Sequence, residues 1–332
     1  MLTFNLDHEA GVMMAIHEFV DYMLNHAMSR EMFVSSLEQL IPAFKAFDQN
    51  ETVSYHSSIL AFQQVVHYVD ALCEQQVYVD VLPRLTDVQV KALRKIVLCQ
   101  RANMIQEIDA FQRQEENNQK ELLSYVHSII QDHYKVLVVR VDLSYLKESI
   151  QQVNIHSFYR HIKTLCDRLK DKNGCFKHLL GYSMALEQGV SKGYHAHLLL
   201  IYNGSERKGD EHIAYQVIQK WQDISFGLGY GFNLHSKEYK KKFEKNNRLG
   251  IGMIHRDNRE EVENILLVTS YLTQPEKYAQ LLLLKPIGTR SFSKGIYKPH
   301  GRHYHTKYQA SNILEDAGQW SAQDLELMLT EN

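Results

Sequence analysis

The spacing of the apolar residues changes near Lys135, and this change divides the chain into two regions with different secondary structure. Up to about Ser128, apolar residues recur every three or four positions, as in AIHEFVDYML and ILAFQQVVHYVDAL, which is the period of amphipathic helices. From Lys135 the run VLVVRVDL concentrates β-branched residues, as buried strands do. The sequence therefore predicts an all-α N-terminal region, with a long polar-faced helix over FQRQEENNQKELLSYVHSII, followed by a sheet.

After the first strand, helical and strand-like patterns alternate. Helices are expected over residues 155–171 and 211–225, and strands over GYSMALEQ and YHAHLLLIYN, which a glycine-flanked loop at 189–193 joins as a hairpin. A Gly- and Lys-rich loop, the strand GIGMIHR and the helix NREEVENILLVTSYLTQ follow, and Pro275 must end that helix. This order predicts an α+β fold in which helices flank an antiparallel sheet.

The formal net charge of −2 hides an uneven distribution of charge along the chain. Counting Lys, Arg, Asp and Glu gives −8 over residues 1–130, +11 over residues 131–310 and −5 over residues 311–332. The basic middle segment is the candidate for contact with a polyanion, although a surplus spread evenly over a surface would bind nothing in particular. We predict three parts: a helical region at 1–128 that could bind a partner or form oligomers, a second domain at 129–310, and an acidic tail at 311–332.

Length and composition favour a globular protein without membrane spans. The 332 residues, 44% of them hydrophobic, suffice for two domains with genuine cores. No apolar run approaches the roughly 18 residues of a membrane helix, and MLTFNLDHEAG lacks the basic-then-apolar order of a secretory signal, so a cytoplasmic location is expected. The four cysteines are too widely spaced to indicate a disulfide framework or a thiolate zinc site.

Two histidines in the second strand of the hairpin could bind one metal ion together. Alternate side chains of a strand share a face, so His195 and His197 in YHAHLLL project together. If the hairpin is centred on Ser191, Glu187 lies opposite His195 on that face, roughly 5 Å away. A slip of one residue in the register would move Glu187 to the other face. Two ordinary sheet histidines, one in solvent and one in the core, are the alternative interpretation.

A tyrosine follows the histidines at a position that suits nucleophilic chemistry. Tyr271 is expected in the last turn of the helix before Pro275. Only about one phenol in a thousand is ionised at neutral pH, so a tyrosine nucleophile needs local help. Core packing is the alternative for one tyrosine among 19. The order along the chain, a strand with two histidines and then a helix with a tyrosine, favours a site.

Several short segments resemble those of one known family. The strand VVRVDL, the hairpin LEQGVSKGYHAHLLLIYNG, the strand GIGMIHR, the helix end SYLTQPEKY and the later TRSFSKG together look like the YagK/YfjJ-like, filamentous-phage (inovirus) replication-endonuclease family. That family is taken to belong to the His-hydrophobic-His initiators of rolling-circle replication. The resemblance covers residues 130–310 approximately, with the segments in the right order, and leaves the helical N-terminal region uncovered.

The resemblance implies a site-specific DNA endonuclease and strand transferase from a phage, plasmid or integrated element. His195 and His197 would bind Mg²⁺ or Mn²⁺ with Glu187 as a third ligand, and Tyr271 would attack the scissile phosphate. The products would be a 5′-phosphotyrosine and a free 3′-hydroxyl. The implied substrate is DNA, single-stranded or in a hairpin origin. Because the sequence has no Gly-x-x-x-x-Gly-Lys loop, duplex unwinding would have to come from elsewhere, so a host helicase is a possible partner, as is a host polymerase that extends the 3′-hydroxyl.

Gln274 departs from the pattern of such families, which commonly place a lysine three residues after the tyrosine. A cation there would stabilise tyrosinate or the phosphate, and Lys277 is the expected substitute beyond Pro275. Without such a cation the chain would be a slow enzyme, or a non-catalytic DNA-binding regulator or interaction protein on the same fold. A zinc hydrolase is a third interpretation, which would need stronger ligands and a general base that the sequence does not reveal.

Basic residues in two segments are the candidates for DNA contact. The run YKKKFEKNNR combines cations with aromatic rings suited to base stacking, although a solvated loop is the equal alternative. Together with the later TRSFSKG and GRHYH segments, the candidates are Lys240, Lys241, Lys242, Lys245, Arg248, Arg290, Lys294 and Arg302. His303 and His305 form a second His-x-His pair, but no apolar strand surrounds it and no tyrosine helix follows.

Overall fold

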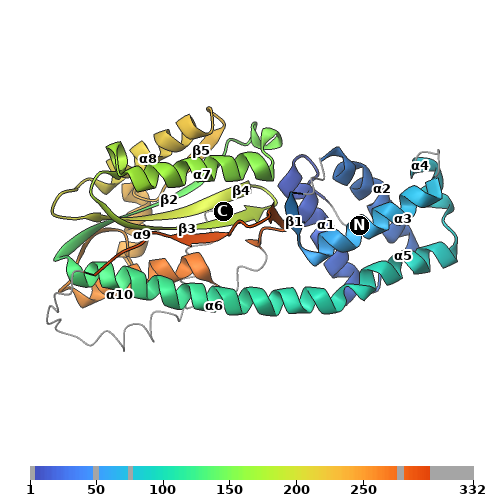
Figure 1. Ribbon diagram of the computed structural model, residues 1–332, viewed down its shortest axis with the longest axis horizontal. Helices are drawn as coiled ribbons and strands as arrows, with labels where there is room; N and C mark the ends of the chain where they lie inside the picture. Colours follow the sequence, from blue (N-terminus) through green and yellow to red (C-terminus); the bar gives the residue numbers. More distant parts are fainter. Residues whose placement is uncertain (1–3, 48–51, 74–77, 275–279, 300–332) are drawn as a thin grey trace.

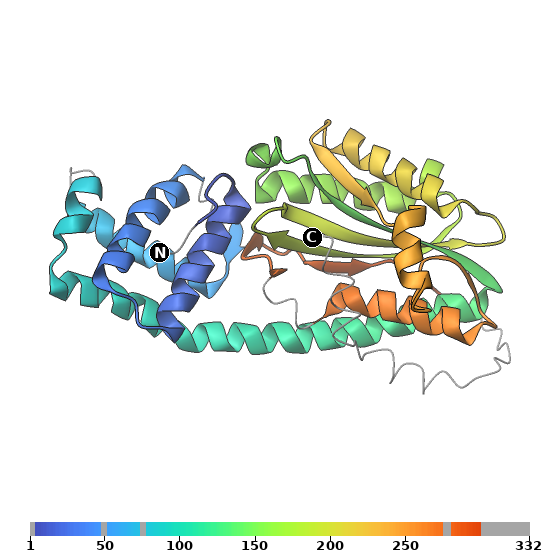
Figure 2. The same ribbon diagram turned by 180° about the vertical axis from the view of Figure 1, so that it is seen from behind.

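A computed structural model of the protein describes residues 4–47, 52–73, 78–274 and 280–299. A helical bundle lies at one end, and a sheet with helices on both faces lies at the other (Figure 1). Seen from behind, the same arrangement shows one long helix, α6 (Arg101–Asp132), running from the bundle along the sheet (Figure 2). Five residues that the sequence singled out lie outside the described residues, as does the acidic tail: Pro275, Lys277, Arg302, His303 and His305.

The N-terminal region is helical, as the spacing of its apolar residues predicts. Among the described residues, side chains cap α1, α2 and α5: His8 Nδ1 accepts a hydrogen bond from the backbone N–H of Gly11, the Ser29 hydroxyl accepts one from Met32, and Thr86 forms a capping box with Gln89. The helices are α1 (Glu9–Asn25), α2 (Arg30–Ala46), α3 (Ser57–Cys73), α4 (Tyr78–Val81), η1 (Leu82–Arg84) and α5 (Asp87–Cys99).

One short strand in the bundle was not expected from the sequence. Strand β1 (Val53–Tyr55) pairs with β7 (Leu284–Pro286) in an antiparallel two-stranded sheet. Three residues are too few to show a period, and the partner lies more than 200 positions away. This pairing ties the C-terminal part of the described chain to the bundle.

The long helix expected from the sequence forms as α6, which is 32 residues long. Its last turns are buried against the sheet through Leu122, Val126 and Ile129, whereas most of its first turns are exposed. Because α6 continues through residue 128, the helical region and the sheet share this element.

Within the described ranges, the main sheet has six strands, all antiparallel, as predicted. The strand order is β5-β2-β4-β3-β8, and β6 pairs with the first part of β2 on the same edge that β5 occupies further along. The strands are β2 (Lys135–Tyr145), β3 (Leu179–Gly189), β4 (Gly193–Asn203), β5 (Gly229–Asn233), β6 (Gly252–His255) and β8 (Phe292–Lys294).

Helices cover both faces of this sheet (Figure 1). Leu198 and Leu200 of β4 pack with α7 and α8, whereas the alternate residues Leu199 and Ile201 pack with α6, α9 and α10. His195 and His197 lie four and two residues before Leu199 on the same strand. Their side chains therefore point to the same face of the sheet and face α6 and α10. The covering helices are α7 (Ile155–Asp171), α8 (Asp210–Ile224), α9 (Lys237–Glu244) and α10 (Arg259–Ser270), with 3-10 turns at η2 (Ile150–Gln152), η3 (Gly174–Phe176) and η4 (Tyr271–Thr273).

The lysine-rich segment that the sequence analysis assigned to a loop contains a helix, α9. The hydroxyl of Ser236 caps its first turn, and Tyr239 and Phe243, four residues apart, bury one face of it. The helix is short and has glycines and lysines around it, so the helical spacing of its apolar residues cannot be recognised in the sequence. In the part of the chain that the structure describes, no helix has both the length and the apolar character that crossing a bilayer requires.

Candidate metal centre

Glu187, His195 and His197 come together on the face of the sheet that α6 and α10 cover. The register of the β3–β4 hairpin places Glu187 directly opposite His195, which confirms the pairing expected from the sequence. Gly189 pairs with Gly193 at the turn, and Gly193 has a φ of +61°, a left-handed conformation that favours glycine. The turn therefore fixes the register on which the cluster depends.

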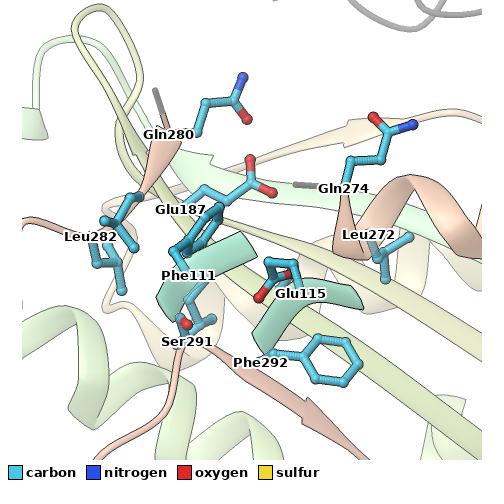
Figure 3. A pocket seen from close by; sticks show the side chains of 12 residues that line it. Phe111, Glu115, Glu187, Leu272, Gln274, Gln280, Leu282, Ser291 and Phe292 are labelled. Atoms are coloured by element: carbon cyan, nitrogen blue, oxygen red, sulfur yellow. The ribbon is translucent and has the colours of Figure 1, made fainter. Parts of the chain in front are cut away.

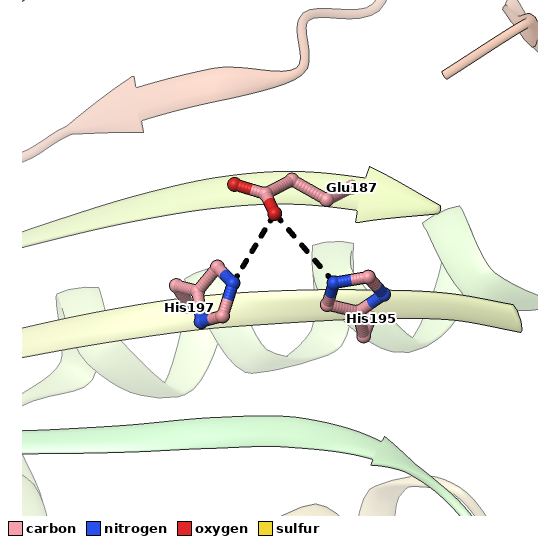
Figure 4. Close-up of side chains that lie close together, drawn as sticks. All are labelled: Glu187, His195 and His197. Atoms are coloured by element: carbon pink, nitrogen blue, oxygen red, sulfur yellow. Dashed lines mark hydrogen bonds and ion pairs between the residues drawn. The ribbon is translucent and has the colours of Figure 1, made fainter. Parts of the chain in front are cut away.

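The three side chains converge on one point (Figure 4). The Oε2 atom of Glu187 lies 3.2 Å from Nε2 of His197 and 3.6 Å from Nε2 of His195. One potential ligand atom from each of the three residues lies within 4.8 Å of the others, and all three residues are buried. Such a group can hold one metal ion.

Hydrogen bonds on the far side of each ring fix the direction of its lone pair. The Nδ1 atom of His195 lies 3.1 Å from the carbonyl oxygen of Gly193, and Nδ1 of His197 lies 2.7 Å from Oδ1 of Asp142. A carbonyl and a carboxylate only accept hydrogen bonds, so each Nδ1 must carry the hydrogen. In the neutral rings, both Nε2 lone pairs then point toward the Glu187 carboxylate.

This arrangement fits a cation better than it fits an empty core. Two nitrogen lone pairs and a carboxylate oxygen repel one another when they are buried without a positive charge between them. Two imidazoles and one carboxylate are ligands that divalent transition metals accept, and a hydrogen bond from the other ring nitrogen commonly orients such histidines. The donor set does not identify the metal.

Asp142 and Arg140, which the sequence analysis did not single out, support this cluster from β2. Asp142 lies opposite His197 in the β2–β4 register, and its Oδ1 atom lies 3.5 Å from Nε of Arg140. Burial alone would raise the pKa of the Asp142 carboxyl, but its interactions with His197 and Arg140 lower it far below its usual value. Asp142 is therefore an anion beside the imidazole. The sequence does contain a signal that could have identified Arg140 and Asp142. They are two charged residues at alternate positions of a buried strand, VVRVDL.

Tyr271 lies beside the cluster and is buried. It follows α10 as the first residue of the 3-10 turn η4, and 1% of its surface is exposed. Its ring centroid lies 6.0 Å from that of His197 in an edge-to-face arrangement, and the guanidinium carbon of Arg140 lies 4.8 Å from the ring centroid. The fold thus brings the tyrosine to the histidines, as the sequence analysis required, but in a position closed to solvent.

A small hollow lies on the outer side of Glu187 (Figure 3). Its volume of about 30 Å³ has room for one or two water molecules, which is too little for a phosphodiester. Glu115 of α6 lines it together with Gln274 and Gln280, and the buried Oε1 atom of Gln280 has no hydrogen-bond partner among the described residues. A larger ligand could reach Tyr271 only if part of this wall moved.

The basic residues of the α9 region lie apart from this hollow. Lys240 forms an ion pair with Asp210, and Nζ of Lys242 lies 5.9 Å from the ring centroid of Tyr239. Contrary to the sequence-based expectation, Tyr239 and Phe243 are not available for base stacking, because both rings are buried. The other cations of this run are Lys241, Lys245 and Arg248.

Arg290 and Lys294 lie in the segment around β8 that adjoins the edge of the sheet. The Arg290 side chain is exposed, and Nζ of Lys294 lies 3.5 Å from a carboxylate oxygen of Glu121 on α6. Both residues line a hollow that shares Ser291 with the one beside Glu187. These two cations are therefore closer in the fold to the metal centre than their distance along the chain suggests.

Comparison with known proteins gives one match. The family model described as the YagK/YfjJ C-terminal domain matches residues 101–280, which include α6, the cluster and Tyr271. No curated protein and no solved structure matches the chain. The matched region begins at the first residue of α6 and leaves the helical bundle outside it.

Proposed function

Because this chain belongs to the YagK/YfjJ C-terminal domain family, we propose that it nicks and rejoins single-stranded DNA through a covalent bond to Tyr271. The Glu187, His195 and His197 cluster would bind Mg²⁺ or Mn²⁺ for this reaction. The 3′-hydroxyl released by nicking would prime rolling-circle replication of a phage or mobile element. This assignment agrees with the family resemblance seen in the sequence.

The proposal rests on one observation: two imidazole lone pairs and one carboxylate converge beside a tyrosine. Metal ligands alone would suit many proteins, and a buried tyrosine alone would suit any core. The edge of the Tyr271 ring against His197, 6.0 Å between centroids, joins the two features in one site. A nucleophile beside a bound cation can act on the same phosphate.

The chemistry follows from the groups at the site. A divalent cation bound by the cluster would polarise the scissile phosphate and offset the charge that develops on its oxygens. The Tyr271 oxygen attacks phosphorus, its P–O bond forms, and the bond from phosphorus to the 3′ oxygen breaks. The phenol proton is lost, and the leaving 3′ oxygen gains a proton. The guanidinium of Arg140, 4.8 Å from the ring centroid, stabilises negative charge on the phenol.

The proposed nicking reaction can be tested by asking which end of the cut DNA strand becomes covalently linked to the protein. Protein is incubated with Mn²⁺ and a pool of random-sequence single-stranded oligonucleotides labelled at either the 3′ or the 5′ end. We expect a denaturation-resistant adduct that keeps the 3′ label and loses the 5′ label. Tyr271→Phe, which keeps the ring, should form none, and neither should wild type in EDTA. An adduct of equal yield in Tyr271→Phe would rule out this nucleophile.

A second candidate function is binding of DNA without chemistry. Two observations favour it: Tyr271 has 1% of its surface exposed, and the buried residue three positions later is Gln274, which has no charge. In that case the wild-type protein would bind single-stranded DNA but give no adduct in Mg²⁺ or Mn²⁺. The cluster would then serve to hold the hairpin and α10 together.

A further inference from the structure

Three hollows lie in a row along one face of α6, beginning at the metal centre. The α6 residues that line them include a series at helical spacing, Phe111, Gln114, Glu115, Asn118, Glu121 and Tyr125, and Lys120, Ser124 and Ser128 also line the third hollow. The first and second hollows share Ser291 and Phe292, and the second and third share Glu121 and Lys294. They therefore form one groove, and the stretch of α6 from Phe111 to Ser128 gives it a length of roughly 26 Å.

The opposite wall of the groove is the segment from Lys285 to Pro299, which includes the edge strand β8. The middle hollow has a volume of about 590 Å³, far larger than the one beside Glu187. Amides, hydroxyls and three cations, Lys285, Arg290 and Lys294, line it against the single carboxylate of Glu121. This composition suits a long anionic ligand and is too polar for an apolar helix or a lipid chain.

The hollow at one end of the groove is lined by Glu187 of the candidate metal centre (Figure 3). There, Glu115 from α6 and Ser291 from the opposite wall lie around Glu187. An anionic chain held by the three cations would therefore run toward the cluster and Tyr271. Helix α9 lies outside this groove, because none of its described residues lines these three hollows.

We propose that this groove between α6 and residues 285–299 holds a single strand of DNA, with phosphates at Lys285, Arg290 and Lys294. The inference rests on the proposed function and adds the path that the substrate takes to the site. At roughly 3.4 Å per phosphate in a stacked strand, the two larger hollows, which follow α6 from Gln114 to Ser128, have room for about six nucleotides, and for fewer in an extended strand. Amides and hydroxyls of the walls contact sugars and phosphates without selecting a sequence.

Equilibrium binding tests the cations of the groove. Fluorescence anisotropy with labelled 15-nucleotide oligo(dT), in EDTA, measures affinity without any reaction. The triple variant Lys285→Ala, Arg290→Ala, Lys294→Ala should bind at least tenfold more weakly. Its slope of log K against log salt should fall by about 2, since each phosphate contact contributes about 0.7. The matched control on exposed α7 positions, Arg160→Ala, Lys163→Ala, Arg168→Ala, should stay within twofold of wild type.

A steric test keeps the proposal falsifiable if the triple variant is unstable. Gln114 lines the groove, whereas Gln112 is an exposed residue about 140° around the helix from the groove-lining face of α6. Gln114→Trp should weaken oligo(dT) binding at least fivefold, and Gln112→Trp should not. Equal affinity of these two variants, or a triple variant within twofold of wild type, would overturn the proposal. Equally tight binding of a polyglutamate peptide by the wild type would also overturn it.

The outcomes separate this inference from the proposed function. If groove variants lose binding while wild type never forms an adduct, the groove holds DNA and the nicking activity is wrong. If Gln114→Trp and the triple variant form adducts at the wild-type rate with subsaturating DNA, nicking stands and the groove is wrong.

Discussion

The contact between Asp142 and His197 is the residue-scale feature that does most to define the metal centre. It holds Nδ1 of His197 as the protonated nitrogen and so directs Nε2 toward Glu187. The three residues of the cluster could be identified from the sequence, because all of them lie in one hairpin whose turn sets the register. Asp142 was missed, because the pairing of β2 with β4 joins strands more than 50 residues apart and no local rule fixes its register.

Replacing Asp142 by Asn should weaken metal binding while leaving the fold intact. The amide oxygen can still accept from Nδ1 of His197, but the negative charge that strengthens the imidazole as a ligand is lost. We expect the Kd for Mn²⁺ to rise by about tenfold or more, measured by isothermal titration calorimetry. Asp167→Asn, an exposed carboxylate on α7, is the control. An unchanged Kd in Asp142→Asn would mean that the contact does not orient a ligand.

At the scale of elements, the β3–β4 hairpin carries the site, and its turn is the sensitive point. A Cβ atom at Gly193 would lie 2.8 Å from Cδ1 of Ile150, and φ there is +61°. At Gly189, the other end of the turn, a Cβ atom would make only an ordinary contact, 3.8 Å from Cε1 of His195. The two glycines frame the same loop but differ in what they tolerate.

Gly193→Ala should therefore destabilise the protein and loosen the metal centre, whereas Gly189→Ala should do neither. The left-handed conformation alone costs an alanine about 1–2 kcal/mol, and the contact with Ile150 adds to it. Urea unfolding monitored by circular dichroism gives the free energy of unfolding of each variant. Equal stabilities for the two would contradict the role assigned to the turn.

Most of the elements that the sequence did not predict, β5 (Gly229–Asn233) among them, are short. Strands β1, β7 and β8 have three residues each, which is too short for a period, and their partners are distant in sequence. Helix α9 was not predicted, because its lysines obscure the helical spacing of its apolar residues. The long elements, α6 and the β3–β4 hairpin, carried enough periodicity to be predicted. The burial of Tyr271 depends on how α6 and η4 pack, which no local pattern contains.

At the scale of the whole molecule, the bundle and the sheet share one core. A single buried cluster includes Phe19 of α1 and Leu198 of β4. The carboxylate of Glu9 on α1 accepts hydrogen bonds from the hydroxyl of Tyr194 on β4 and from the backbone N–H of Ile155 on α7, each at 2.7 Å. The bundle lies outside the region that the family model matches. Its first helix nevertheless packs into the core of that region and forms hydrogen bonds with it.

Glu9→Ala should lower the stability of the whole chain, since it leaves two buried donors without partners. Each unsatisfied donor costs about 1–3 kcal/mol, so the midpoint of urea unfolding should fall clearly. Glu18→Ala, an exposed position on the same helix, serves as the control and should have little effect. A Glu9→Ala midpoint equal to that of Glu18→Ala would show that the bundle and sheet are not coupled through this carboxylate.

Mn²⁺ binding followed by electron spin-echo spectroscopy tests the metal centre most directly. The account predicts one tightly bound Mn²⁺ per chain, with nitrogen couplings from the imidazoles of His195 and His197. One coupling should disappear in His195→Ala and one in His197→Ala, and Glu187→Gln should weaken binding without removing either. Binding without nitrogen coupling, or no stoichiometric binding at all, would contradict the account.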